Sequence, residues 1–144
     1  MASETVDERP VAGETQQVAQ SDTGLDENVA GALSYFFGIV TGVLFFVIDD
    51  RPSVRFHAAQ SMVLSGALIA VFVAMSVLNT ILFATMLGDT FLIGTLLWLG
   101  FSLVWLVVGL GGFVLWIYMM YSAYKGKRVV LPVVGGFAEN IAAR

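Results

Sequence analysis

Two long apolar segments decide the fold: AAQSMVLSGALIAVFVAMSVLNTILFATMLG (residues 58–88) and TFLIGTLLWLGFSLVWLVVGLGGFVLWIYMMYSAY (residues 90–124). They contain 31 and 35 residues without a charged side chain, and only Asp89 separates them. A helix needs about 20 apolar residues to cross a hydrocarbon core of about 30 Å. Each segment is therefore longer than one membrane span and shorter than two.

Asp89 decides between two divisions of this region. Either two long or tilted helices meet near Asp89, or three helices are present and Asp89 lies inside the middle one, at about residues 80–97. The second division is less favourable, because an Asp at the centre of a membrane helix costs about 2.5–3.5 kcal/mol. The sequence thus favours two long helices in this region.

Aromatic residues refine the bounds of these helices. Trp98 and Tyr121 lie 23 residues apart, or about 34 Å of helix, and Trp and Tyr favour both membrane interfaces. We therefore predict spans at about residues 58–80 and 97–122. Residues 81–96 are then helical extensions or an apolar hairpin in the outer leaflet.

A shorter uncharged run, VAGALSYFFGIVTGVLFFVI (residues 29–48), comes before them. Twelve of its twenty residues are Val, Leu, Ile or Phe, and its length matches one crossing. The charges and proline at residues 49–52 oppose continuation of an apolar helix. We predict an all-α integral membrane bundle with three transmembrane helices in a domain of residues 29–124, at about residues 29–48, 58–80 and 97–122.

The first 28 residues differ from the rest in composition. They hold seven acidic residues, one cation (Arg9), no aromatic residue and no apolar run longer than two. Such a segment cannot bury enough apolar surface to offset the entropy lost on ordering. We therefore predict a disordered acidic tail over residues 1–28.

Composition excludes several classes of protein. The 144 residues are 58% hydrophobic and 12% charged, whereas soluble domains are about 45–50% apolar and about 25% charged. The few cations form no basic face, so we expect no nucleic acid partner. The chain has no cysteine and no Ser/His/acid set or phosphate-binding glycine pattern. We expect no enzyme activity, no catalytic residue, no metal and no cofactor.

Lys and Arg near the span ends predict the orientation, because cytoplasmic loops are enriched in them. With three spans, one side receives six cations and the other receives only Arg9, together with the acidic tail and the Asp89 loop. We predict a multi-pass protein of the cell membrane with its N-terminus outside and its C-terminus in the cytoplasm. The cytoplasmic cations would be Arg51, Arg55, Lys125, Lys127, Arg128 and Arg144.

Small residues recur every four positions in the first two predicted spans, a pattern that lets helices approach closely. The favoured interpretation is that the two stripes pack against each other within one molecule. The alternative is a contact between subunits. The candidate packing residues are Ser34, Gly38 and Gly42 in the first span and Gly66, Ala70 and Ala74 in the second.

Polar side chains persist into the start of the second predicted span, where they need partners. His57, Gln60 and Ser61 share one helical face, because residues three and four apart are neighbours. We predict a hydrogen-bonded structural cluster that faces the bundle; ion or substrate handling and a pH or cofactor role are the alternatives. A lone histidine does not supply the roughly three protein ligands of a catalytic metal site. The candidate functional polar cluster is Arg55, His57, Gln60 and Ser61.

Tyrosines at intervals of three end the last predicted span, and the basic stretch Lys-Gly-Lys-Arg follows. We expect these residues to anchor the chain at the interface and attract anionic headgroups, with docking of a partner protein as the alternative. Residues 125–144 are predicted to be a basic collar and an amphipathic cytoplasmic segment that folds back onto the membrane. The candidate lipid or partner collar is Tyr121, Tyr124, Lys125, Lys127 and Arg128.

Three groups of residues carry a resemblance to a known family: Leu33-Ser34-Tyr35 with Gly38 and Gly42, VRFHAAQS at residues 54–61, and AYKGK at residues 123–127 with LPVVG at residues 131–135. Over about residues 30–142 the chain resembles the small uncharacterised prokaryotic membrane proteins of the Tic-twenty-like type. Relatives of that type in the chloroplast inner envelope belong to the protein import apparatus and have four spans, whereas this chain is predicted to have three. The resemblance implies a multi-pass membrane protein of unassigned activity.

These observations lead to two expectations about function. The first is a structural or interaction subunit of a membrane complex, such as one that handles or translocates proteins, with the lipid bilayer and a membrane protein or a second copy as partners. The second is a small transporter or channel. Three helices enclose little space, so such a pore would need several copies, and the small-residue stripes offer a contact between them.

Overall fold

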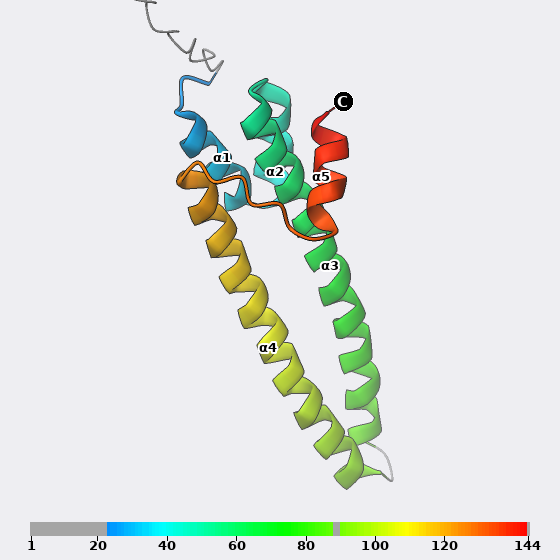
Figure 1. The fold of residues 1–144 in the computed structure, drawn as a ribbon. Coiled ribbons are helices and arrows are strands. Elements are labelled where there is room, and N and C mark those ends of the chain that lie inside the picture. The colour runs from blue at the N-terminus through cyan, green and yellow to red at the C-terminus, as the bar shows by residue number, and fades with distance from the viewer. Residues whose placement is uncertain (1–22, 88–89, 144) are drawn as a thin grey trace, which may run out of the picture.

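The structure is a computed structural model that describes residues 23–87 and 90–143. All regular secondary structure in these two ranges is helical. A long hairpin projects from a compact end formed by three shorter helices (Figure 1). The elements in chain order are α1 (Glu27–Phe36), α2 (Ile39–Ile48), α3 (Pro52–Met86), α4 (Phe91–Tyr124) and α5 (Val134–Ala142).

Helices α3 and α4 form the long antiparallel hairpin (Figure 1). Pro52 stands in the first turn of α3, where its missing N–H costs no helical hydrogen bond. Near the far end the helices approach closely, since a Cβ on Gly94 would lie 2.7 Å from backbone atoms of Thr85 and Met86. The predicted pair of long apolar helices is thus confirmed, and residues 81–86 and 91–96 are helical extensions.

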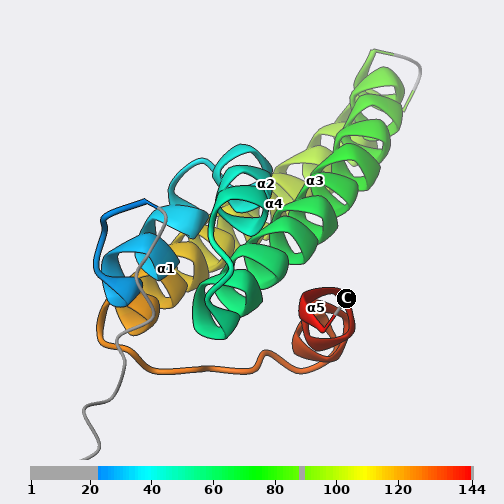
Figure 2. The ribbon, with the colours of Figure 1, turned by 90° about the horizontal axis from the view of Figure 1, so that it is seen from above.

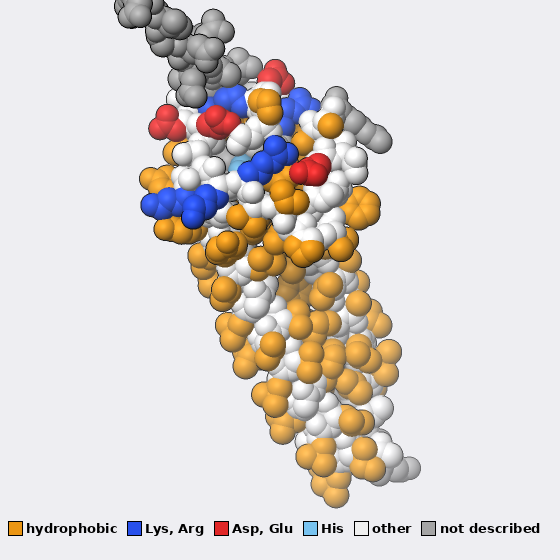
Figure 3. Space-filling view, viewed as in Figure 1, with side chains coloured by type: hydrophobic (Ala, Val, Ile, Leu, Met, Phe, Trp, Pro, Cys, Tyr) orange, Lys and Arg blue, Asp and Glu red, His pale blue; other side chains and the backbone are white. Residues whose placement is uncertain are grey.

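The apolar side chains of this hairpin face outward. In the most apolar 18-residue windows of α3 and α4, 0% and 6% of the residues are buried. A core helix of a soluble protein would be mostly buried. Hydrophobic side chains cover the hairpin, whereas charged side chains gather at the compact end (Figure 3). Both helices are long and apolar enough to cross a membrane.

The structure corrects the prediction of one spanning helix over residues 29–48. These residues form two helices of ten residues each, α1 and α2, which are antiparallel and lie at the same end of the molecule (Figures 1 and 2). Each is only about 15 Å long. Gly38 separates them with φ 57° and ψ −117°, a conformation that glycine adopts readily and other residues rarely adopt. Three transmembrane helices are therefore not confirmed.

Most of the predicted acidic tail lies outside the described residues, which begin at residue 23. Its last two residues, Glu27 and Asn28, already belong to α1. The first helix thus begins two residues before the boundary predicted at residue 29.

The C-terminal segment packs against the protein. After α4 the chain crosses the compact end and leads to α5, which lies beside the start of α3 (Figure 2). Ala138 is fully buried in a cluster with Phe56 and Ala59 of α3. The guanidinium of Arg128 stacks 4.1 Å from the centre of the Phe56 ring. Helix α5 thus packs on α3 and leaves Phe137 62% exposed, and its contact with the membrane surface stays a prediction.

Candidate functional site

The break between α1 and α2 creates a local need for hydrogen-bond partners. Carbonyl groups at the end of a helix have no partner within it, and an unpaired backbone group is costly in an apolar environment. The carbonyl oxygens of Ser34 and Tyr35 lie at the end of α1, and the Tyr35 oxygen accepts the Gly38 N–H at 3.2 Å. The Gly38 oxygen, at the start of α2, accepts the Gly42 N–H at 2.9 Å. Side chains from α2, α3 and α4 meet them.

Three donors satisfy these carbonyl oxygens. The Ser61 hydroxyl of α3 lies 2.6 Å from the Ser34 oxygen and 3.0 Å from the Gly38 oxygen. The Thr41 hydroxyl donates to the Ser34 oxygen at 3.0 Å and accepts from the Phe37 N–H at 3.1 Å. The indole N–H of Trp116 in α4 donates to the Tyr35 oxygen at 2.6 Å. The break is therefore held by hydrogen bonds from three helices.

His57 lies one turn away from Ser61, toward the start of α3, and contacts α1. It is 3% exposed, and its Nδ1 lies 3.4 Å from the hydroxyl oxygen of the buried Tyr35. A Cβ on Gly31 would lie 3.1 Å from the imidazole, so the glycine makes room for the ring. The ring edge also meets Phe56. His57 is thus a packed, buried histidine between helices.

Gln60 is buried completely, yet neither atom of its side-chain amide has a hydrogen-bond partner among the described residues. The predicted cluster is therefore confirmed in its placement, since His57, Gln60 and Ser61 are all buried on α3. It differs in its bonding, because His57 and Ser61 bond to α1 and to the break at Gly38 rather than to each other.

Arg55 lies apart from the three buried residues. Its guanidinium stacks 4.5 Å from the centre of the Phe46 ring of α2, and its Nη1 lies 3.4 Å from a carboxylate oxygen of the exposed Asp50. The predicted cluster of four therefore divides into three buried residues and one cation near the surface.

A buried ion pair at the α2–α3 connection was not predicted from the sequence. Arg51 donates to both carboxylate oxygens of Asp49, at 2.9 and 2.6 Å, and neither side chain is more than 7% exposed. Arg51 also donates to the carbonyl oxygen of Leu25 at 3.1 Å. The hydrogen bonds from Arg51 lower the pKa of Asp49 against the opposing effect of burial. This pair ties the start of the described chain to the loop after α2.

The two stripes of small residues have different surroundings. Ser34 is buried, and a Cβ on Gly38 or Gly42 would lie within 3 Å of Ser65 or Met62 of α3. The first stripe therefore packs within the molecule. The second does not meet it: Gly66 has open space where a Cβ would stand, and Ala70 and Ala74 are exposed. The expected packing of one stripe against the other is thus corrected.

The predicted collar surrounds the end of α4. Tyr121 and Tyr124 are 58% and 57% exposed, and the Lys125 ammonium lies 5.6 Å from the centre of the Tyr121 ring. Arg128 turns toward α5, with Nη2 3.8 Å from a carboxylate oxygen of Glu139. Lys127 is exposed. The collar is therefore a partly exposed belt of aromatic and basic residues.

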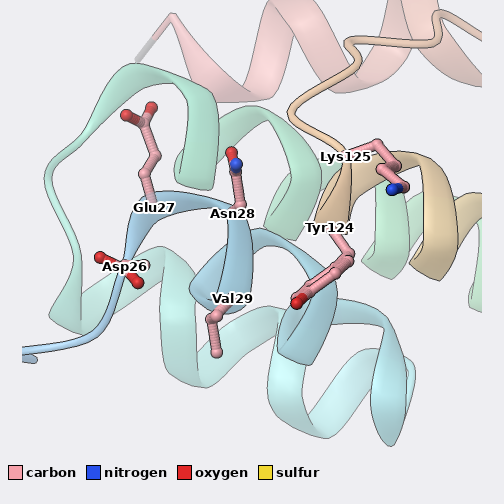
Figure 4. A pocket seen from close by; sticks show the side chains of 6 residues that line it. All are labelled: Asp26, Glu27, Asn28, Val29, Tyr124 and Lys125. Atoms are coloured by element: carbon pink, nitrogen blue, oxygen red, sulfur yellow. The ribbon is translucent and has the colours of Figure 1, made fainter.

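An open pocket of about 590 Å³ lies between the start of α1 and the end of α4 (Figure 4). Its side chains are polar or aromatic apart from Val29. The lining residues are Asp26, Glu27, Asn28, Val29, Tyr124 and Lys125. Within residues 23–87 and 90–143, no group of three or more His, Asp or Glu side chains lies close enough to hold a metal ion.

Comparison with known proteins places these features in a family. A family model described as the magnetosome magnetite crystal formation protein family matches residues 25–138. A UPF0132 membrane protein of Methanocaldococcus jannaschii is 38% identical over 124 residues, which cover 85% of this chain and 94% of the relative. A UPF0132 membrane protein of Archaeoglobus fulgidus is 35% identical over 117 residues, which cover 81% and 95%. No solved structure matches the chain.

These relatives support a family of small membrane proteins, as the resemblance implied, but not the Tic-twenty-like label. The match to the family model begins just before α1 and extends into α5, so it includes the helix break, the buried polar residues of α3 and the whole α3–α4 hairpin. The chain therefore belongs to the magnetosome magnetite crystal formation protein family.

Proposed function

We propose that the protein is a non-enzymatic structural or interaction subunit of a membrane complex. The observation that carries this proposal is the division of the surface in Figure 3. The α3–α4 hairpin exposes apolar side chains along its length, and the charged residues gather at the compact end. Such a chain is held in the bilayer by two helices and offers its charged end to partners.

Only α3 and α4 cross the membrane in this proposal. The Arg51 contact with the Leu25 carbonyl oxygen brings the residues before α1 and the loop after α2 to one end of the molecule. Asn28 and Gly126 also approach there, since a Cβ on Gly126 would lie 3.0 Å from the Asn28 amide oxygen. The cations of residues 51–55 and 125–128 share that end. By the positive-inside rule, both termini are cytoplasmic, and this topology replaces the expected outside N-terminus.

In this arrangement α1 and α2 form a re-entrant hairpin. At about 15 Å, each is half as long as the hydrocarbon core is thick. The outer face is apolar: Phe37, Val40 and Val47 are 68%, 71% and 72% exposed. Broken backbone is tolerated at membrane depth where protein groups pair with it, and Ser61, Thr41 and Trp116 supply those groups.

The family description names magnetite crystal formation. For this chain we propose an assembly role in the membrane, which requires no catalytic or metal-holding residue. The exposed collar and the outer face of α5 are the surfaces available to a partner on the cytoplasmic side. The exposed aromatic residues of these surfaces are Tyr121, Tyr124 and Phe137.

The test is native co-purification from gently solubilised membranes, with the tag at the C-terminus and mass spectrometry as the readout. We expect other membrane proteins in a constant ratio to the bait. The variant Phe137→Ser changes an exposed residue of α5 and tests whether α5 is the contact, in which case that recovery should fall. Recovery of the bait alone, as a discrete oligomer, would overturn the proposal.

A small oligomeric transporter or channel is the second candidate. One observation favours it: the stripe of Gly66, Ala70 and Ala74 is open in the monomer, and small residues let transmembrane helices from different subunits approach closely. Reconstitution in lipid nanodiscs separates the two candidates. A monomer at all protein concentrations excludes this candidate, whereas an oligomer that Ala70→Leu dissociates supports it.

A further inference from the structure

Two neighbouring cavities lie along the boundary between α1 and α4. The polar pocket between Asp26 and Lys125 adjoins a second cavity of about 360 Å³, whose walls are almost entirely apolar. Tyr124 lines both cavities. The residues that line the apolar cavity, called here the α1–α4 groove, are Ala32, Ile117, Met120, Tyr121 and Tyr124.

The charges of the polar pocket are arranged in two parts. Asp26 and Glu27 carry carboxylates on the α1 side, and Lys125 carries an ammonium on the α4 side, beyond Tyr124 (Figure 4). The Lys125 ammonium lies 5.6 Å from the centre of the Tyr121 ring, which is a wall of the α1–α4 groove. None of these three charged groups forms a salt bridge within the described ranges. The pocket therefore offers separate partners for a negative and a positive group.

We propose that this site binds one phospholipid whose headgroup carries a primary amine. The hydrocarbon chain lies in the α1–α4 groove, the phosphate lies beside Lys125, and the amine donates hydrogen bonds to Asp26 and Glu27. Charge complementarity selects this occupant, because a headgroup with an anionic phosphate and a cationic amine matches one ammonium and two carboxylates. A choline headgroup has no N–H to donate, and an anionic headgroup without an amine leaves both carboxylates facing negative charge.

The proposed membrane placement supports this assignment, and the inference rests on it. With α3 and α4 as the spans, the end of α4 lies at the cytoplasmic interface, where headgroups are found. The groove then descends beside the hydrocarbon chains. A free phosphate ester has no chain to fill the groove, so the intact lipid is the occupant that matches both cavities.

Native mass spectrometry of the full chain tests the proposal. The purified protein is mixed with equal amounts of phosphatidylethanolamine, phosphatidylcholine and phosphatidylglycerol of the same chain length. We expect retention of phosphatidylethanolamine to exceed that of the other two by about tenfold. Equal retention of the three lipids would overturn the proposal. Displacement of the bound lipid by O-phosphoethanolamine alone would also overturn it, because the groove would then contribute nothing.

Separate variants test the phosphate contact and the amine contacts of the site. Lys125→Gln should lower retention of both phosphatidylethanolamine and phosphatidylcholine, because both carry the phosphate. The double variant Asp26→Asn/Glu27→Gln should remove the preference between these two lipids. Lys127→Gln is the matched control, since Lys127 is an exposed cation that does not line the pocket. A loss with Lys127→Gln as large as that with Lys125→Gln would assign the effect to general attraction and overturn the site.

The membrane placement is measured separately, by labelling single-cysteine variants of the protein from either side of the membrane. A chain that crosses twice as proposed, yet retains the three lipids equally, contradicts the lipid site alone. A chain whose N-terminus is labelled only from outside contradicts the placement, and with it both proposals.

Discussion

The Ser61 hydroxyl lies 2.6 Å from the carbonyl oxygen of Ser34, a residue 27 positions earlier in the chain. The contact connects the first third of the long helix α3 to the end of α1. It supplies a donor at the point where the α1 backbone loses its helical partners. Ser61, a polar residue in an apolar helix, therefore stabilises the break between α1 and α2 through this hydrogen bond.

Replacing this serine should destabilise the protein. Ser61→Ala removes one side-chain donor from the carbonyl oxygens of Ser34 and Gly38, which keep the Thr41 hydroxyl and the Gly42 N–H as partners. We therefore expect the loss of one hydrogen bond, about 0.5–1.5 kcal/mol. Thermal unfolding in detergent, followed by circular dichroism, measures the effect. Ser76→Ala is the control, because Ser76 lies on the same helix and is exposed. Equal unfolding temperatures for the two variants would contradict the role of Ser61.

Gly38→Ala should be more harmful than most glycine substitutions in this chain. The φ of 57° with ψ −117° is costly for an alanine, by about 1–3 kcal/mol. Its Cβ would also lie 2.5 Å from the Ser65 hydroxyl oxygen. We expect a clear loss of stability and of folded yield, measured by size-exclusion chromatography and thermal unfolding.

Gly66→Ala is the matched control for Gly38→Ala. Gly66 lies within α3, where alanine favours the helix by about 1 kcal/mol over glycine, and a Cβ there meets open space. We expect unchanged or higher stability. A loss with Gly66→Ala equal to that with Gly38→Ala would show that the two stripes share the same packing role, against the structure.

The sequence predicts the parts of this fold that depend on local composition. Two uncharged runs on either side of Asp89 predict α3 and α4, and spacings of three and four place His57, Gln60 and Ser61 on one face. The turn at Gly38 is not predicted, because residues 29–48 have the length and hydropathy of a spanning helix. The turn depends on partners distant in sequence, Ser61 and Ser65 of α3.

The ion pair after α2 is also not predicted from the sequence, because it too depends on contacts with distant residues. Asp49 and Arg51 stand two residues apart in a short loop, and such a pair usually lies in solvent. Here both side chains are buried, since Arg51 also reaches the Leu25 carbonyl oxygen. That contact exists only because the chain turns back at Gly38. One missed turn therefore accounts for the missed ion pair and for the incorrect first span.

Cysteine labelling tests the two-span topology directly, because the chain has no cysteine of its own. Single substitutions Ser3→Cys and Asn140→Cys should both react with a membrane-impermeant maleimide only after the cells are opened. Thr90→Cys, at the far end of the α3–α4 hairpin, should react in intact cells. Labelling of Ser3→Cys in intact cells would instead support three spans with the N-terminus outside.

The Asp49–Arg51 pair should make stability depend on pH in the acid range. Hydrogen bonds from Arg51 hold the pKa of Asp49 below its usual value, so the carboxylate stabilises the fold at neutral pH. This contribution is present above the unfolded pKa of about 3.9 and is lost as the pH falls through the lower folded pKa.

Asp49→Asn should therefore destabilise the protein at pH 7, by about 3 kcal/mol, because it leaves the buried guanidinium of Arg51 without its counter-charge. The difference in unfolding temperature from the unsubstituted chain should begin to shrink as the pH falls below about 3.9, because Asp49 of the unfolded chain then binds a proton, and it should disappear only below the lowered pKa of Asp49 in the folded protein. Asp50→Asn is the control: Asp50 is exposed, its contact with Arg55 is 3.4 Å long, and exposed pairs contribute about 0–1 kcal/mol. A difference for Asp49→Asn that stays constant from pH 7 to 3 would contradict the coupling between this ion pair and the fold.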